Sequence, residues 1–515
     1  MRRLVLAVLT PLLVLTACSG DDTEPPAFSP TLAWGDCPPD VEVTFLSRHE
    51  CGILTVLANR AEPSGPTIEL LVARVWPVGK EPVPGLGSSF GANVGDPRAL
   101  SGGIATGTTR LGGVGVEIEW RGAGPHVDPV LRCPEVEELQ PDFAAARSDD
   151  TAVVDSFVDG VRRCGERLRT EGIDPADFDA TEAAADLEDL RVALEVDRWR
   201  VLGVNGSQSR YLYEYFREFP GGAGPAYLDS PWPAGVDDLT GGVLGTRAAL
   251  DEVFRVCKRS AECGDGGEGS LEDSWAAALD RLALEPLVGT HRSRSGDEVD
   301  VLIDAGKLLR AARFTLGGDG PDNLTHLPQI IRDAERGRLH PKLAEIVATD
   351  PGLCFGYRPL CAGQDEFSWG VYLTSLCRDQ LPFLDEERLD RAVADDPVFR
   401  SVFAESPYIA ACEAWDVPPA PMPPAPAPTL ASAPLLLLPG QFDSFTDRAW
   451  AEAYADGSGG SVQLLVGPAQ THNTLGFSEC VISARNTWVV DPDDPITDAC
   501  GPQQVPWAEP MRRNR

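Results

Sequence analysis

Three residues spaced along the chain have side chains that could together carry out nucleophilic acyl transfer. They are Ser207, Asp443 and His472, and each follows a short apolar run of the sequence. A serine hydroxyl becomes a strong nucleophile when a histidine accepts its proton and a carboxylate orients that imidazole. The order serine, acid, histidine, with each residue in a loop after a strand, is a known arrangement of this triad. The sequence therefore predicts a serine-based hydrolytic site.

The turn that would carry the nucleophile admits two alignments. Such a nucleophile lies on a sharp strand-to-helix turn with small residues on both sides. Counting from the preceding strand, over residues 203–207 (GVNGS), places Asn205 at the nucleophile position. Counting back from the following helix places Ser207 there, between Asn205 and Ser209. Asparagine tolerates positive φ but cannot replace an activated hydroxyl, and Ser207 could also be an ordinary helix N-cap, so the alternatives stay open.

Apolar and β-branched runs predict the strands that must position these residues. The predicted strands cover residues 67–75, 114–120, 199–203, 227–229, 433–440 and 461–467. Helices are predicted at residues 185–196 and 209–219, the second ended by Pro220 and Gly221. Strand, sharp turn, helix and strand is the order typical of a parallel sheet with helices on both faces. The predicted fold class is therefore α/β, with a mostly parallel sheet.

A block of different character interrupts this pattern. Between residues 236 and 416 several stretches repeat apolar residues at three- and four-residue spacing, which predicts an inserted helical cap. A Pro-rich connector at residues 417–434 is expected to be stiff and extended, and apolar strands resume after it. We therefore expect one α/β core in two parts, residues 31–235 and 435–515, with the cap between them.

The first seventeen residues predict an export signal. Arg2 and Arg3 precede an apolar run at residues 4–15, which is too short to span a bilayer as a mature helix. The run ends in LTAC, which resembles a bacterial lipobox and makes Cys18 the predicted lipidation site. The alternative is a plain signal peptide with an incidental cysteine. Residues 18–30 would then be a lipidated tether that holds an exported protein at the extracytoplasmic face of the cell membrane.

Export would place the other twelve of the 13 cysteines in an oxidising compartment, where disulfides persist. Local pairs are plausible for Cys37 with Cys51, Cys257 with Cys263, Cys354 with Cys361, and Cys480 with Cys500. The four that remain allow more than one connectivity: Cys133, Cys164, Cys377 and Cys412. The chain has no CxxC pair, so zinc ligation is disfavoured.

The charge of the chain excludes two classes of partner. The formal net charge is −35 at pH 7, and phosphate binding needs clustered lysine and arginine, so nucleic acid is excluded. An anionic membrane surface is excluded as the attracting partner for the same reason. Attachment to a membrane is therefore expected only through lipid at Cys18.

The chain resembles a known family over most of its predicted mature length. The family is that of secreted actinobacterial α/β hydrolases related to tripeptidyl aminopeptidase and proline iminopeptidase, with their characteristic C-terminal domain. The most specific match is HNTLG at residues 472–476, followed by Cys480, Asp491-Pro492 and Cys500. Further matches are EWRGAG at 119–124, LRCPE at 131–135, VDRW at 196–199, LD at 228–229, LCRD at 376–379 and CEAW at 412–415.

This resemblance implies an α/β-hydrolase fold, with Asp443 as the acid and His472 as the base of the triad. The sequence also departs from the family pattern. The oxyanion motif P-G-G-P-G is absent, and residues 85–95 (GLGSSFGANVG) offer only a Gly-rich stretch of backbone N–H groups. The G-x-S-x-G elbow is altered, and Glu119 and Trp120 stand where the family has D-Q.

Two functions follow as hypotheses. The first is an exported serine hydrolase that resembles an exopeptidase and releases short peptides or residues from peptide N-termini, with a cap carboxylate holding the free amine. Its substrate would be a peptide or a small ester or amide, and it would need neither metal nor organic cofactor. The alternative is a degenerate homologue that binds peptide or envelope ligands without turnover. A lipase or esterase ranks lower, because no exposed apolar lid is evident in the sequence.

Overall fold

The computed structural model describes residues 28–39, 41, 47–77, 89–91, 114–206, 209–232, 235–260, 263, 269–292, 296, 298–318, 322–349, 368–421, 433–457, 462–493, 495–496 and 499–508. For residues 47, 77, 89–91, 140, 201–206, 349 and 457 it describes the backbone alone. Cys18, Ser207, Cys354 and Cys361 therefore lie outside the described residues, as do most of the Gly-rich stretch at 85–95 and most of the Pro-rich connector.

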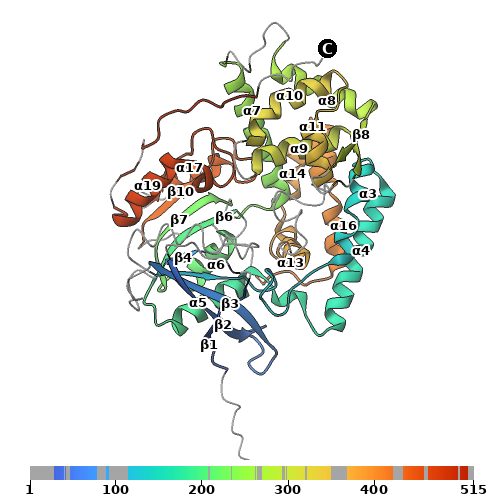
Figure 1. The fold of residues 1–515 in the computed structure, drawn as a ribbon. Helices are drawn as coiled ribbons and strands as arrows, with labels where there is room; N and C mark the ends of the chain where they lie inside the picture. The colour runs from blue at the N-terminus through green and yellow to red at the C-terminus, as the bar shows by residue number, and fades with distance from the viewer. Residues whose placement is uncertain are drawn as a thin grey trace, which may run out of the picture.

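A nine-stranded sheet forms the centre of the described chain, and it confirms the predicted α/β class (Figure 1). Its strands, in spatial order, are β1 (Thr31–Gly35), β2 (Ser47–Leu57), β3 (Thr67–Pro77), β5 (Gly115–Ile118), β4 (Ser89–Gly91), β6 (Trp199–Gly206), β7 (Ala223–Pro231), β10 (Leu435–Leu438) and β11 (Val462–Leu464). The pairs among β1, β2, β3 and β5 are antiparallel. From β5 to β11 every pair is parallel, so the carboxyl ends of these strands meet at one edge.

Helices cover both faces of the parallel part of the sheet. On one face lie α5 (Ala180–Ala193), α6 (Ser209–Glu218) and α17 (Arg448–Gly457), and on the other α19 (Glu479–Val490). Strand β10 shows why its sequence is a continuous run of leucine. Leu435 and Leu437 enter the first cluster of buried residues, whereas Leu436 and Leu438 pack with Trp488 of α19 on the opposite face. A strand buried on both faces has no polar side to show in its sequence.

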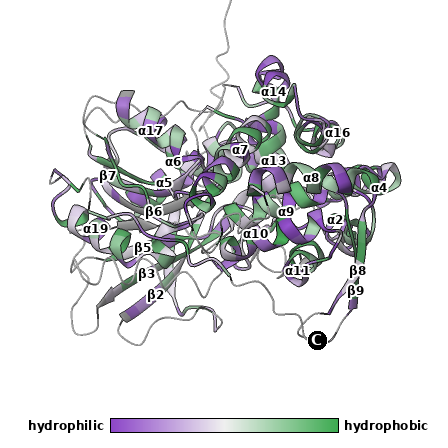
Figure 2. Cartoon of the chain, turned by 90° about the horizontal axis from the view of Figure 1, so that it is seen from above, coloured by the Kyte–Doolittle hydropathy of each residue, from purple (hydrophilic) through white to green (hydrophobic). Residues whose placement is uncertain are grey.

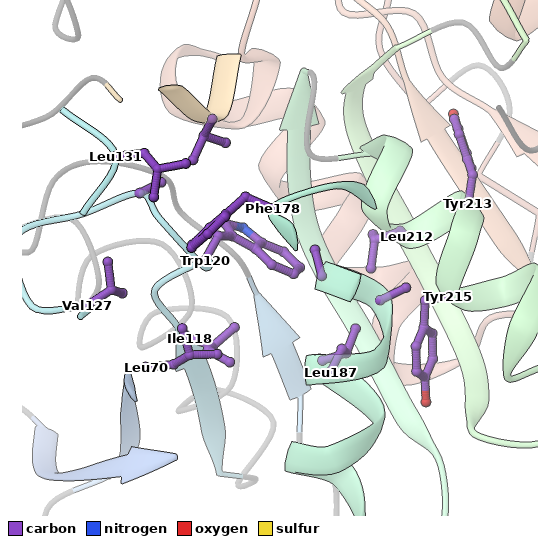
Figure 3. Packing of buried hydrophobic residues seen from close by; sticks show 14 of the residues in the cluster. Leu70, Ile118, Trp120, Val127, Leu131, Phe178, Leu187, Leu212, Tyr213 and Tyr215 are labelled. Carbon is purple, nitrogen blue, oxygen red and sulfur yellow. The ribbon is translucent and has the colours of Figure 1, made fainter. Parts of the chain in front are cut away.

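The first cluster continues beneath the antiparallel strands. Figure 3 shows Leu70 beside Ile118, and Trp120 against Phe178, with Leu187 and Leu212 further along the same cluster. Trp120 also meets Tyr211 edge to face, with ring centroids 4.9 Å apart. Aromatic pairs of this geometry add about 0.5–1.5 kcal/mol beyond the area that they bury. This packing fixes the helix that follows the β6 turn against the sheet.

The cap is built mainly of helices, with one hairpin that the sequence pattern did not predict (Figures 1 and 2). Its larger helices are α7 (Asp238–Cys257), α8 (Leu271–Leu284), α9 (Ala305–Gly317), α10 (Asp322–Glu335), α11 (Pro341–Thr349), α13 (Trp369–Asp379), α14 (Glu386–Val393) and α16 (Pro407–Trp415). Short turns complete it: η2 (Leu381–Phe383), α15 (Pro397–Phe399) and the π-helix η3 (Arg400–Ala404). Strands β8 (Leu287–Arg292) and β9 (Glu298–Ile303) form an antiparallel pair, and β9 buries Val301 and Ile303. Helices α8, α9 and α10 carry hydrophobic and hydrophilic residues on the same element, as expected of helices packed on one side.

The segment between β5 and β6 joins the cap to the core. It holds α2 (Pro134–Glu137), α3 (Gln140–Ala145), α4 (Thr151–Thr170) and η1 (Pro175–Asp177). Helices α4 and α16 lie side by side, and Trp415 of α16 is buried in the same cluster as Phe157 of α4. Helix α3 is held to α9 by the Lys307 ammonium, which donates to the carbonyls of Phe143 and Ala144 at 2.6 and 2.8 Å. No helix in the described part of the chain is both long enough and apolar enough to cross a membrane.

Five disulfides lie within the described residues. Three are local pairs that the sequence predicted: Cys37–Cys51, Cys257–Cys263 and Cys480–Cys500. The other two settle the pairing that the sequence left open: Cys133–Cys164, which joins α2 to α4, and Cys377–Cys412, which joins α13 to α16. The fourth predicted local pair, Cys354 with Cys361, falls outside the described residues.

Arg121, in the EWRGAG segment, is a buried structural residue. Its guanidinium makes a two-pronged contact with the Asp186 carboxylate of α5, at 2.7 and 2.6 Å, and donates to the Ala58 carbonyl at 2.7 Å. Arg60 reaches the same Asp186 carboxylate at 2.7 Å. The three residues tie the end of β2, the segment after β5 and helix α5 together.

We expect Arg121→Ala to lower the free energy of unfolding by about 3–5 kcal/mol, because it removes one partner of a buried ion pair. Urea denaturation of the purified protein measures this. The matched control is Arg162→Ala on α4, an exposed arginine that pairs with Glu166 at 2.8 Å and should change stability by less than about 1 kcal/mol. A loss below about 1 kcal/mol for Arg121→Ala would show that the buried pair has no structural importance.

Candidate active site

Asp443 and His472 meet at the carboxyl edge of the parallel strands. Asp443 follows β10 and His472 follows β11, and these two strands are paired in the sheet. The His472 Nδ1 atom lies 2.8 Å from Asp443 Oδ2. Both residues are buried: the exposed fraction is 1% for His472 and 3% for Asp443. The acid and the base that the sequence proposed are therefore hydrogen-bonded to each other, although 28 residues separate them in the chain.

The Asp443 carboxylate is held by its own loop as well as by the imidazole. Its Oδ1 atom accepts from the backbone N–H groups of Phe445 and Thr446, at 2.8 and 3.0 Å. Its Oδ2 atom accepts from the Thr446 hydroxyl and from His472. Burial raises the pKa of Asp443, but the charge and hydrogen bond of His472 and the bonds from Thr446 outweigh it, so the pKa lies below its ordinary value. Asp443 is thus an ionised acceptor that fixes Nδ1, which makes Nε2 the ring nitrogen suited to proton transfer.

The two loops that carry this pair are joined to each other. They are the acid loop at residues 439–447, after β10, and the histidine loop at residues 465–473, after β11. Phe442 N donates to the Gln470 carbonyl at 2.9 Å, and the Gln441 side chain accepts from Ala469 N at 2.9 Å. A side chain at Gly440 would place its Cβ 1.8 Å from the Thr471 carbonyl oxygen, so only glycine fits there. The Phe445 ring meets the His472 ring edge to face at 5.7 Å. The acid loop and the histidine loop therefore form one packed unit.

The cap rests directly on this unit. Gly245 of α7 lets the helix backbone approach the Ser444 carbonyl, because a Cβ there would lie 2.5 Å from that oxygen. The Ser444 hydroxyl donates to the Arg313 carbonyl of α9 at 2.6 Å, and the Arg313 guanidinium lies 4.4 Å from the centre of the Phe445 ring. The Gln441 amide donates to Glu252 of α7 at 2.7 Å. These contacts place the cap beside the acid of the pair.

The connection between β6 and α6 bears on the alignment of the nucleophile turn. Strand β6 continues further than predicted, and Asn205 and Gly206 pair with Asp229 and Pro231 of β7. Helix α6 begins at Ser209. Asn205 is therefore a strand residue, and Ser207 with Gln208 makes up the connection between strand and helix. Ser207 itself lies outside the described residues.

The structure also assigns contacts to residues for which the sequence offered no role. Asp229, at the end of β7, accepts hydrogen bonds from the segment that follows His472, and so does Ser230. The resemblance marked residues 228–229 as a landmark, but no local pattern shows a contact with residues some 245 positions away. No cluster of three or more metal-ligating side chains occurs among the residues described.

Comparison with known proteins finds one family model that matches the C-terminal part of the chain, and solved structures of low sequence identity. Residues 396–500 match the family model described as TAP-like protein, a range that includes Asp443 and His472. No curated protein matches the chain. Similar solved structures include a serine hydrolase from Cycloclasticus zankles, at 9% identity over 86% of this chain and 100% of that one, with a TM-score of 0.32. They also include an esterase from Exiguobacterium antarcticum (9%, 83% and 96%, TM-score 0.32) and a thermophilic esterase from Thermogutta terrifontis (13%, 86% and 99%, TM-score 0.33). With its strand order, its paired aspartate and histidine, and the match of residues 396–500 to the TAP-like model, the chain has an α/β-hydrolase fold.

Proposed function

We propose that the chain is a serine hydrolase in which Ser207 is the nucleophile, His472 the general base and acid, and Asp443 the residue that orients the imidazole. The observation that carries the proposal is the 2.8 Å bond between buried Asp443 and His472 at the carboxyl edge of the sheet. The course of β6 supports Ser207 over Asn205, because Asn205 is paired within the strand and Ser207 follows its end.

In this mechanism the Ser207 Oγ attacks the substrate carbonyl carbon while His472 Nε2 takes the hydroxyl proton. The imidazolium is stabilised by the Asp443 carboxylate and returns the proton to the leaving nitrogen or oxygen, which breaks the scissile bond and leaves an acyl-enzyme. Water attacks the acyl-enzyme, and His472 again accepts and returns the proton. The oxyanion is expected to accept hydrogen bonds from the backbone N–H groups of Gln208 and of the Gly-rich stretch at 85–95.

The TAP-like match supports an exopeptidase as the finer proposal. Such an enzyme recognises the free N-terminal ammonium of a peptide, and a carboxylate of the cap would pair with it. The cap lies against the acid loop through Gly245 and Ser444, where it would limit substrates to short chain ends. A substrate whose N-terminus is blocked could not form this ion pair and would leave the carboxylate of the cap unpaired.

A panel of chromogenic aminoacyl and tripeptidyl amides tests this specificity. We expect the free peptidyl amides to be cleaved with a kcat/KM about a hundredfold or more above that of their N-acetylated forms. The acetylated peptides are the matched controls, since they differ only at the amine. Equal cleavage of both forms would exclude an exopeptidase, and cleavage of simple esters alone would favour an esterase.

We further propose that the protein is exported and anchored through lipid at Cys18. The motivating observation is the apolar run at residues 4–15 that ends in LTAC. In a bacterial host fed an alkyne fatty acid, we expect the full chain to be labelled and to sediment with membranes. The Cys18→Ala variant should carry no label. Equal labelling of that variant would show that Cys18 is not the modified residue.

A further inference from the structure

Asp229 lies on the strand between the two strands that lead into the nucleophile turn and the acid loop. It is close to the carboxyl end of β7 and pairs with Asn205 of β6 on one side and Leu438 of β10 on the other. The nucleophile turn follows β6 and the acid loop follows β10. The exposed fraction of Asp229 is 2%. A carboxylate buried in this way must be satisfied by hydrogen bonds, and its donors show what it holds.

Three of the donors to Asp229 come from the segment that follows His472, and the neighbouring Ser230 hydroxyl also lies 3.4 Å from Oδ1. Thr474 donates to Oδ1 through its backbone N–H at 2.9 Å and through its hydroxyl at 2.7 Å. Leu475 N donates to Oδ2 at 2.9 Å. The neighbouring Ser230 hydroxyl accepts from Asn473 N at 2.9 Å. Three consecutive backbone N–H groups after His472 are thus bound by two adjacent side chains of β7.

These bonds replace a cap that the histidine loop does not supply for itself. Helix α18 (Thr474–Phe477) begins directly after Asn473, whose φ of 59° is left-handed and whose side chain makes no capping hydrogen bond. The first N–H groups of a helix have no partner within the helix. A cap from the same loop would tie the helix only to itself, whereas a cap from β7 ties it to the sheet.

Ser230 supports the same interpretation. Its φ of 47° is one that residues other than glycine rarely adopt, so serine is strained there and glycine would not be. The Ser230 hydroxyl accepts a hydrogen bond from the histidine loop that glycine cannot accept.

We propose that Asp229 and Ser230 are positioning residues that hold the backbone next to His472 and so set where its imidazole lies. Asp443 fixes the ring through Nδ1, while Asp229 and Ser230 fix the chain from which the ring projects. Displacement of a catalytic group by about 1 Å can lower a rate a hundredfold. As a statement about catalysis, this inference rests on the proposed role of His472 as general base.

Two variants test the inference by kinetics. Asp229→Asn keeps the shape but turns an amide NH₂ toward a backbone donor, and Ser230→Gly removes the acceptor while suiting the backbone. We expect each to lower kcat about tenfold to a hundredfold with KM within about twofold of the wild type. Thr474→Val removes the hydroxyl donor and should lower kcat to a similar extent. Thr474→Ser keeps that donor and should have a kcat close to that of the wild type. The matched control is Tyr227→Phe on β7, which removes a buried hydrogen bond to Arg485 and should leave kcat within about twofold.

A readout that needs no activity separates this inference from the proposed function. In proton NMR, the imidazole Nδ1–H bound to Asp443 should give a downfield signal that is lost by exchange in Asp229→Asn and Ser230→Gly but kept in Tyr227→Phe. Amide exchange at residues 473–475 should quicken in the same two variants. If these two variants lose the signal while the wild type shows no hydrolytic activity, the positioning role stands and the proposed function is rejected. An unchanged signal and unchanged kcat in Ser230→Gly would overturn the positioning role, even if Asp229→Asn fails to fold.

Discussion

Replacing Asp443 with asparagine is expected to lower kcat about 10⁴-fold while KM changes little. The carboxylate accepts a hydrogen bond from Nδ1–H, with an N···O distance of 2.8 Å. This keeps the proton of the neutral ring on Nδ1 and leaves Nε2 able to take the proton of a serine. An asparagine amide group placed there can donate to Nδ1, which favours the tautomer that carries its proton on Nε2. Asp443→Asn therefore keeps the shape of the site and removes its general base.

The matched control is Asp447→Asn, four residues along the same loop. The Asp447 side chain accepts from Ala449 N at 3.0 Å, and asparagine can accept the same bond. Steady-state kinetics should show this control within about threefold of the wild type, because asparagine caps a helix about as well as aspartate. A kcat for Asp443→Asn within tenfold of the wild type would mean that Asp443 does not orient the histidine.

The same carboxylate predicts a dependence of stability on pH. The folded pKa of Asp443 lies below its ordinary value of 3.8, so the ionised form is favoured by folding. Its contribution is fully present above the unfolded value and is lost as the pH falls through the lower folded value. Below about pH 4 the melting temperature should therefore fall less steeply with falling pH in Asp443→Asn than in the wild type.

Gly440→Ala is expected to have the largest effect on folding of any single methyl group added near the site. The new Cβ would lie 1.8 Å from the Thr471 carbonyl oxygen, which is backbone and cannot rotate away. The loops of Asp443 and His472 would have to separate. We expect a loss of at least about 3 kcal/mol in urea denaturation, at the upper end of the cost of overpacking, together with a loss of most activity.

The control for Gly440→Ala is Gly221→Ala, between α6 and β7. A Cβ at Gly221 meets no atom within 4 Å, so alanine there should be neutral or slightly stabilising. If Gly440→Ala were as stable and as active as Gly221→Ala, the two loops would not be packed as the structure shows.

The strands and the helices beside them could be predicted because their pattern is local. The run LLLL at 435–438 has only one interpretation once both faces of a strand are buried, and β10 forms there. Asp443 and His472 could be found because each lies in a loop after such a run. The β8–β9 hairpin could not be, since its strands mix Thr290, His291 and Asp300 with apolar residues inside a helical region.

Contacts between distant segments set the limit of what the sequence could predict. Four unassigned cysteines allow three connectivities, and only the fold brings Cys133 to Cys164 and Cys377 to Cys412. The role of Asp229 is of the same kind, because its partners lie far along the chain. The proposal of Ser207 over Asn205 rests on where β6 ends, which a short run of small residues does not reveal.

A fluorophosphonate probe on the purified protein tests whether Ser207 is a nucleophile activated by His472. We expect the wild type and Ser209→Ala to be labelled, and Ser207→Ala and His472→Ala to stay unlabelled. Ser209 is a matched control because it lies two residues from Ser207 and its hydroxyl accepts from Trp232 N at 2.8 Å. An unlabelled wild type, or labelling that survives in Ser207→Ala, would show that Ser207 is not the nucleophile and would favour a protein that binds its ligand without turnover.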